Sequence, residues 1–124
     1  KVRNWKKWKM TDTYDFGDGP VAAHKHVNGD GWVADTSFVS YTAYVGPDAL
    51  VFGNALVLGN ARVSGDAKVF GYSVVYGDAM VYGHSKVYGN AMICENAWVA
   101  GYSRVYGNAM ISGRTRVFGG VENG

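Results

Sequence analysis

Cationic and aromatic side chains recur together in the middle of the chain at a spacing of eighteen residues. The residues are Lys68, Lys86 and Arg104 and, two places after each, Phe70, Tyr88 and Tyr106. Ammonium and guanidinium groups bind phosphate oxygens, and flat rings can stack on a base. If these residues share one face, the pattern predicts a site for a nucleotide, another phosphorylated ligand or single-stranded nucleic acid. The alternative is a solvated face on which Lys and Arg stems cover aromatic rings.

The three histidines are the candidates for acid–base or metal chemistry. His24 and His26 lie near Asp30 early in the chain, and His84 lies far from them in sequence. His84 could act as a general base, or it could be a turn residue in a place where Asn is more frequent. His24, His26 and Asp30 could form a site, or they could belong to a loop that caps the fold.

These residues must be positioned by a six-residue repeat, which runs without insertion or deletion from Val33 and whose register extends back through Val27 and Val21. Each step has the form V-x-G-N/D-A/S-x. Its first place is Val or Ile, which suits a pleated, half-buried surface. Its third place is usually Gly and its fourth often Asn or Asp, the residue types that tolerate positive φ. Each step therefore predicts a short strand followed by a sharp turn.

A parallel β-helix is the architecture that accommodates such steps. An α-helix does not tolerate Gly every six residues, and a meander of hairpins needs turns that reverse the chain. The repeat resembles that of the hexapeptide-repeat family, whose coils wind into a left-handed prism with three flat sides. The resemblance covers roughly residues 21–122 and implies an all-β fold, a single-stranded left-handed parallel β-helix. Residues 1–20 are predicted to be a basic, aromatic N-terminal arm or cap.

One side of the predicted prism is apolar where a monomer would expose polar groups. A large apolar patch usually marks an interface, and proteins of the resembled family are usually trimers with ligand sites between subunits. We therefore expect a homotrimer; a monomer that docks another protein through this face is the alternative. The predicted interface residues are Phe38, Leu56, Leu58, Val74, Tyr76, Met92 and Met110.

The resemblance also raises the possibility of an enzyme. Acyltransferases of the family use a His in a cleft between subunits, with a loop expelled from the coil, and no loop interrupts this repeat. Its zinc enzymes use three His from adjacent subunits, but here His84 is expected about three coils above His24 and His26. We therefore predict no catalytic residue, no metal and no cofactor, with an acyltransferase-like enzyme as the alternative.

Residues 14–35, followed by tandem V-x-G-N-A-x steps, are similar to small hexapeptide-repeat proteins of bacteriophages and prophages. That resemblance implies a place in the host cytoplasm or in a virion, where a structural role is a further alternative. Ahead of this stretch, Trp5 and Trp8 lie among Lys and Arg residues. Such an arm could contact another protein, nucleic acid or an anionic membrane, or it could be a cap or a leftover tail.

Composition limits what else the chain can be. Its 124 residues are enough for one domain, its formal charge of +2 is too small to name a partner, and no apolar run is long enough to span a membrane. The single cysteine cannot form an internal disulfide. We predict a non-catalytic binding or assembly protein, a homotrimer that holds a nucleotide-like ligand, with a possible protein partner for the arm and no membrane partner.

Overall fold

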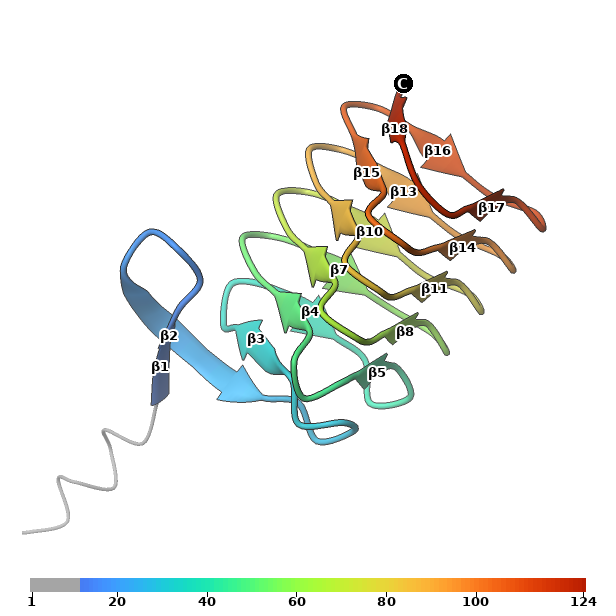
Figure 1. The fold of residues 1–124 in the computed structure, drawn as a ribbon. Coiled ribbons are helices and arrows are strands. Elements are labelled where there is room, and N and C mark those ends of the chain that lie inside the picture. Colours follow the sequence, from blue (N-terminus) through green and yellow to red (C-terminus); the bar gives the residue numbers. More distant parts are fainter. Residues whose placement is uncertain (1–11) are drawn as a thin grey trace, which may run out of the picture.

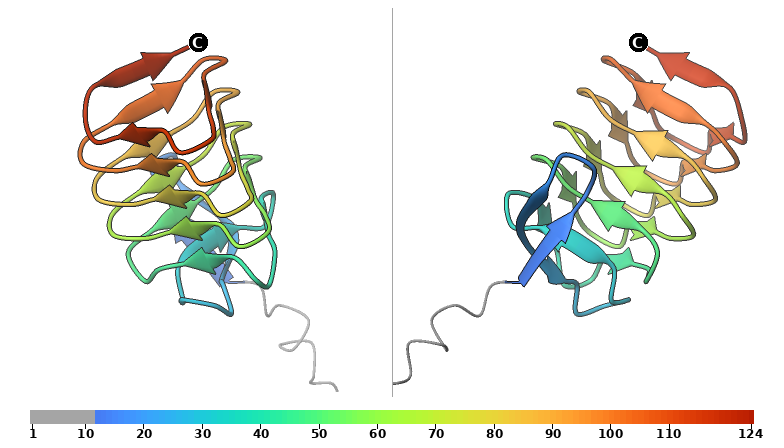
Figure 2. Two further views of the ribbon diagram at one scale, coloured as in Figure 1. Left: turned by 90° about the vertical axis from the view of Figure 1, so that its right-hand side faces the viewer. Right: turned by 60° about the vertical axis from the view of Figure 1, so that its left-hand side comes forward.

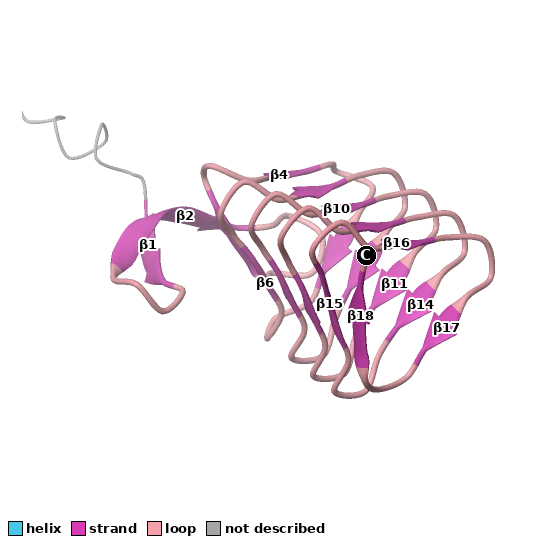
Figure 3. Ribbon diagram, turned by 90° about the horizontal axis from the view of Figure 1, so that it is seen from above, coloured by secondary structure: helices cyan, strands magenta, loops and turns pink. Residues whose placement is uncertain are grey.

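Residues 12–124, which the computed structural model describes, form strands and turns and contain no helix. The chain winds into a stack of coils, and each coil adds one short strand to each of three sheets (Figure 1). Val57 pairs with Val75, eighteen residues further on, so one coil takes three steps of the repeat. The predicted three-sided parallel β-helix is confirmed. Seen from above, the chain runs clockwise while it climbs toward the viewer, which makes the coil left-handed (Figure 3).

Sheet A has eight strands, in the order β1-β2-β3-β6-β9-β12-β15-β18. The pairs β1–β2 and β2–β3 are antiparallel, and all later pairs are parallel. The strands are β1 (Asp12–Asp15), β2 (Pro20–Lys25), β3 (Trp32–Ala34), β6 (Leu50–Val51), β9 (Lys68–Val69), β12 (Lys86–Val87), β15 (Arg104–Tyr106) and β18 (Val121–Asn123).

Sheets B and C have five parallel strands each. Sheet B consists of β4 (Phe38–Val39), β7 (Leu56–Val57), β10 (Val74–Val75), β13 (Met92–Ile93) and β16 (Met110–Ile111). Sheet C consists of β5 (Tyr44–Val45), β8 (Arg62–Val63), β11 (Met80–Val81), β14 (Trp98–Val99) and β17 (Arg116–Val117).

The core is a column of small and β-branched side chains along the axis of the prism. The first place of each step points inward, and Val57, Val75 and Ile93 on sheet B are fully buried. The fifth place fills the corners with Ala or Ser, as at Ala79 and Ser85. Each coil is tied to the next by backbone hydrogen bonds, so burial and hydrogen bonding repeat together along the axis.

The N-terminal end of the prism departs from the predicted repeat. Val21 and Val27 were expected to continue the inward valine column, but their side chains are 46% and 74% exposed. Val21 lies on β2, which pairs antiparallel with β1 and β3 and belongs to a hairpin beside the first coil (Figure 2). The inward column therefore begins at Val33. No helix able to cross a membrane occurs within residues 12–124.

Candidate functional site

The three predicted cations lie side by side on sheet A. Lys86 pairs in register with Lys68 on one side and with Arg104 on the other. No carboxylate within residues 12–124 forms a salt bridge with any of the three. Side chains on neighbouring strands begin about 4.8 Å apart, so these positive charges repel one another without compensation. Such a row favours a bound anion.

The predicted rings form a continuous stack on the same sheet, one residue beyond the inward valine of each strand. Ring centroids are 4.7 Å apart between Phe52 and Phe70, 5.0 Å between Phe70 and Tyr88, and 5.1 Å between Tyr88 and Tyr106, and the planes are within 7° of parallel. Because neighbouring rings cover each other's faces, a base cannot enter between them. The ring edges, and the hydroxyl groups of Tyr88 and Tyr106, are what this stack can offer a ligand.

The alternative interpretation, in which cations cover rings, describes sheet C and the N-terminal end of sheet A, where the Lys25 ammonium lies 5.6 Å from the centre of the Trp32 ring. On sheet C, the Arg62 guanidinium carbon lies 4.4 Å from the centre of the Tyr44 ring, and that of Arg116 lies 4.0 Å from the Trp98 ring. Within the described part of the chain, Lys68, Lys86 and Arg104 make no such contact. Among the described residues, Lys68, Lys86 and Arg104 are therefore engaged neither by a carboxylate nor by an aromatic ring.

The hairpin extends the ring stack, which sequence reasoning missed. Phe16, which follows β1, stacks on Phe52 with centroids 4.8 Å apart. Tyr14 stacks on Trp32 at 5.0 Å and meets Phe16 edge to face. One feature of the sequence could have indicated this contact. Ala34 is a small residue at the place in β3 where β6, β9, β12 and β15 are followed by or contain a ring, so the ring column lacks a member there.

The predicted interface residues share sheet B. Phe38, Leu56, Val74, Met92 and Met110 form one in-register column on it. Phe38 and Met110 at the two ends are 57% and 62% exposed, and the residues between them are half-buried or exposed. This column is an apolar strip along the whole prism.

A second column of the same sheet contains Leu58 and Tyr76, followed by Cys94. Leu58 and Tyr76 are half-buried, and Cys94 is buried. A hydrogen bond with the Cys94 side chain raises the pKa of Tyr76 above its usual value.

The structure does not bring His24, His26 and Asp30 into one site. The His24 ring nitrogen Nδ1 lies 2.7 Å from Oδ1 of Asp35. The His26 side chain is buried, and its Nε2 donates a 2.8 Å hydrogen bond to the carbonyl of Ala43, so it holds the loop before β3 against the first coil.

His84 lies at the corner between sheets C and A, where it takes the turn place of the repeat. Its ring stacks on Tyr102 of the next coil at 4.7 Å, and its Nδ1 lies 3.5 Å from a carboxylate oxygen of Asp66 in the coil before. Among residues 12–124, no three His, Cys, Asp or Glu side chains are grouped so that they could hold a metal ion. Trp5 and Trp8 of the predicted arm lie outside the described residues.

Comparison with known proteins supports the fold. A family model described as YdcK Beta solenoid repeat matches residues 61–77, which contain β8, β9 and β10 and therefore one strand of each sheet. The comparison with curated proteins finds no match, and neither does the comparison with solved structures. The chain is thus a hexapeptide-repeat β-solenoid in its architecture.

Proposed function

We propose that the protein is a non-catalytic β-helical binding protein that holds a nucleotide or a similar phosphorylated ligand on sheet A. The observation that carries this proposal is the row of Lys68, Lys86 and Arg104, three cations on consecutive strands without a carboxylate partner in the described residues. A phosphate chain laid across the row would remove the repulsion between them.

The ring stack supplies the polar edge of this site. Tyr88 and Tyr106 lie two residues after Lys86 and Arg104 on the same face, so their hydroxyl groups can donate to the same anion. Between the coils the base of a nucleotide would lie against ring edges, because both faces of Tyr88 and one face of Tyr106 are covered by neighbouring rings. We therefore expect the phosphates to supply most of the affinity.

We further propose that the chain forms a homotrimer through the apolar column of sheet B, with the ligand near the boundary between subunits. The support is the continuous strip from Phe38 to Met110, which a lone prism would leave in water. The bacteriophage setting, in the host cytoplasm or in a virion, stays a prediction from the resemblance of residues 14–35.

Calorimetric titration with inorganic pyrophosphate, ADP and adenosine tests the site. Pyrophosphate and ADP should bind and adenosine should not, and both affinities should fall as salt is added. Lys86→Gln and Arg104→Gln should each weaken ADP binding by about 10- to 150-fold, because each removes a charge-assisted contact of about 1.5–3 kcal/mol. Arg114→Gln is the matched control, since this exposed cation lies at the corner between sheets B and C.

Phosphorus NMR of the bound ADP separates binding from catalysis. The nucleotide should be recovered unchanged after long incubation with the protein. His84→Asn should leave binding intact, because Asn is common at this place of the repeat. ADP binding that survives both cation substitutions, or conversion of the bound ADP, would overturn the proposal.

A further inference from the structure

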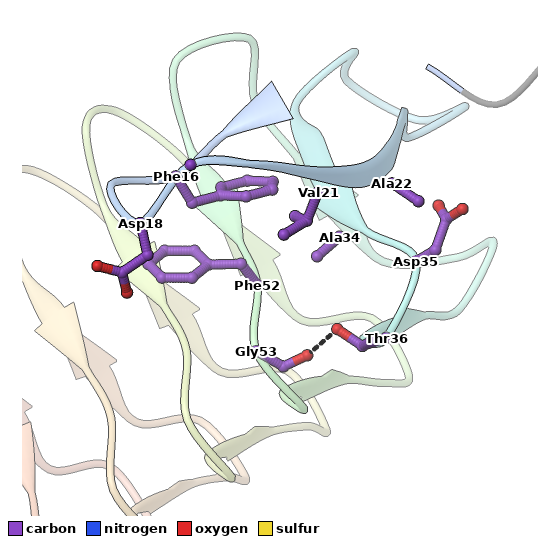
Figure 4. A pocket seen from close by; sticks show the side chains of 10 residues that line it. Phe16, Asp18, Val21, Ala22, Ala34, Asp35, Thr36, Phe52 and Gly53 are labelled. Atoms are coloured by element: carbon purple, nitrogen blue, oxygen red, sulfur yellow. Dashed lines mark hydrogen bonds between the residues drawn. The ribbon is translucent and has the colours of Figure 1, made fainter. Parts of the chain in front are cut away.

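A cavity of about 280 Å³ lies between the N-terminal hairpin and the corner of the first coils, away from the row of cations (Figure 4). Phe16, Val21 and Ala22 line it from the hairpin, and Ala34 of β3 and Phe52, which follows β6, line it from the first coils. Its walls are therefore mostly hydrocarbon, as in a typical site for a small organic molecule.

The cavity exists because the ring column of sheet A is incomplete in the first coil. Later strands carry Phe52, Phe70, Tyr88 or Tyr106 in this column, whereas β3 carries Ala34. Phe16 from the hairpin covers Phe52, but it does not fill the space above Ala34. Ala22 on the neighbouring strand β2 is also too small to fill this space (Figure 4). The gap is thus bounded by stacked rings on one side and by two alanines on the other.

Two carboxylates lie at opposite sides of this cavity, Asp18 in the hairpin turn and Asp35 after β3 (Figure 4). None of the residues that line it is Lys, Arg or His. His24 approaches Asp35 through Oδ1 only, and among the described residues Oδ2 accepts no hydrogen bond. Thr36, which also lines the cavity, donates its hydroxyl to the Gly53 carbonyl and is therefore already satisfied.

The hairpin turn holds Asp18 in place. The carboxylate of Asp15 accepts hydrogen bonds from the backbone N–H groups of Gly17 at 2.8 Å and Gly19 at 3.0 Å. Both glycines have positive φ, so the turn around Asp18 has a conformation that other residues rarely adopt. The turn therefore fixes the backbone of Asp18 at one side of the cavity, with its carboxylate directed outward (Figure 4).

We propose that this cavity binds a small aromatic amine, a ligand class distinct from the phosphorylated ligand of sheet A. The apolar body of the amine occupies the space between Phe52, Val21 and Ala34, and its ammonium group binds Oδ2 of Asp35, which accepts no hydrogen bond among the described residues. A cavity of about 150 Å³ already admits benzene, so the volume here has room for a ring with a short amine chain. The negative charge at both sides selects a cation and rejects an organic acid.

Titration of the full chain with 2-phenylethylamine, followed by NMR, tests this proposal. The amine should bind, and 2-phenylethanol, which has a similar shape without the charge, should bind at least about tenfold more weakly. Asp35→Asn should weaken amine binding most, and Asp18→Asn should weaken it less, because it removes a more distant charge at the opposite side of the cavity. Asp48→Asn, an exposed turn residue of a later corner, should change nothing.

A cavity-filling variant separates this site from non-specific adsorption. Val21→Trp places a large ring in the cavity from an exposed position and should abolish amine binding. Val121→Trp is the matched control, because Val121 is similarly exposed, at 57%, at the opposite end of the prism. Lys86→Gln should not affect the amine, so this test can fail or succeed independently of the phosphate site.

Three results would overturn the inference. They are equal affinity for 2-phenylethylamine and 2-phenylethanol, amine binding that persists in Val21→Trp, and no binding of the amine at millimolar concentration. Circular dichroism of each variant should match the parent chain, so that a loss of binding is not mistaken for a loss of fold.

Discussion

Gly71 illustrates what the repeat demands of a single residue. Its φ is +69°, and a Cβ added there would lie 2.9 Å from the backbone nitrogen of Gly89 in the next coil. Both the backbone conformation and the close approach therefore require glycine. Glu95 takes the same place in a later step with φ +58°, and its carboxylate accepts a 2.6 Å hydrogen bond from the Gly113 N–H, which offsets part of the strain.

We expect Gly71→Ala to lower the free energy of unfolding by about 1–2 kcal/mol or more, from the left-handed conformation and the contact with the next coil. Gly119→Ala is the control, because a Cβ at Gly119 meets nothing within 4 Å and its φ is not in the left-handed region. Urea unfolding measured by circular dichroism compares the two. Equal stability of both variants would contradict the role assigned to the turn glycine.

At the scale of the element, the ring stack of sheet A joins consecutive coils through side chains as well as through backbone hydrogen bonds. Phe70, Tyr88 and Tyr106 each touch a ring on a neighbouring strand, and the same strands are paired by their backbones. Contacts between stacked rings add about 0.5–1.5 kcal/mol to the effect of burial. The stack therefore stabilises the face on which the proposed phosphate site lies.

Removing a central ring should cost stability. We expect Tyr88→Ala to lower the free energy of unfolding by about 1–3 kcal/mol, because two stacked contacts are lost. Tyr72→Ala should cost much less, since Tyr72 is 66% exposed at a corner. Thermal unfolding of the two variants gives the comparison, and a similar loss in both would show that stacking adds nothing beyond ordinary burial.

On sheet A the rings and the cations form two columns on either side of the inward valines, so the two kinds of side chain can be substituted separately. Tyr88→Phe keeps both stacked contacts and removes one hydroxyl. We expect it to retain the stability of the parent chain and to weaken ADP binding by a few-fold, as for the loss of one neutral hydrogen bond. Unchanged ADP affinity would remove Tyr88 from the proposed site.

At the scale of the whole molecule, the protein is a one-dimensional stack in which each coil contacts the coil before and the coil after it. Such a molecule is an elongated prism, and it presents three long, flat sides. The sides differ in chemistry: sheet A carries cations and rings, sheet B carries an apolar column, and sheet C carries arginines over rings. The proposed ligand site lies on the first, and the proposed self-association uses the second.

If the chains associate through sheet B, a charged side chain introduced on that sheet should dissociate the trimer. Light scattering should give the mass of three chains for the parent protein, and Met92→Lys should reduce it to that of one chain, because a lysine in an apolar interface has no partner. Met80→Lys is the matched control, since Met80 is also half-buried and holds the equivalent place on sheet C. A parent protein with the mass of one chain would refute the trimer.

The fold was predictable because the repeat imposes the same local demand at every step. A β-branched residue at the first place, a left-handed turn at the third and a small residue at the fifth predict parallel coils that bury the valines, as Val57, Val75 and Ile93 show. The three sides and the left hand were implied by the resemblance to the hexapeptide-repeat family. The fixed step of six also placed Lys68, Lys86 and Arg104 on one face. Register follows from covalent spacing when no insertion interrupts it.

What the tertiary structure decided involves segments that the repeat does not relate to each other. Val21 fits the sequence period but is exposed, because a residue is buried only where a coil encloses it. The contact of Phe16 with Phe52 and the cavity over Ala34 arise because the N-terminal hairpin packs against the first coils. The stacking that closes the ring faces is likewise a matter of side-chain packing. By itself, the sequence determined the period and the columns, while long-range packing determined which surfaces stay open to a ligand.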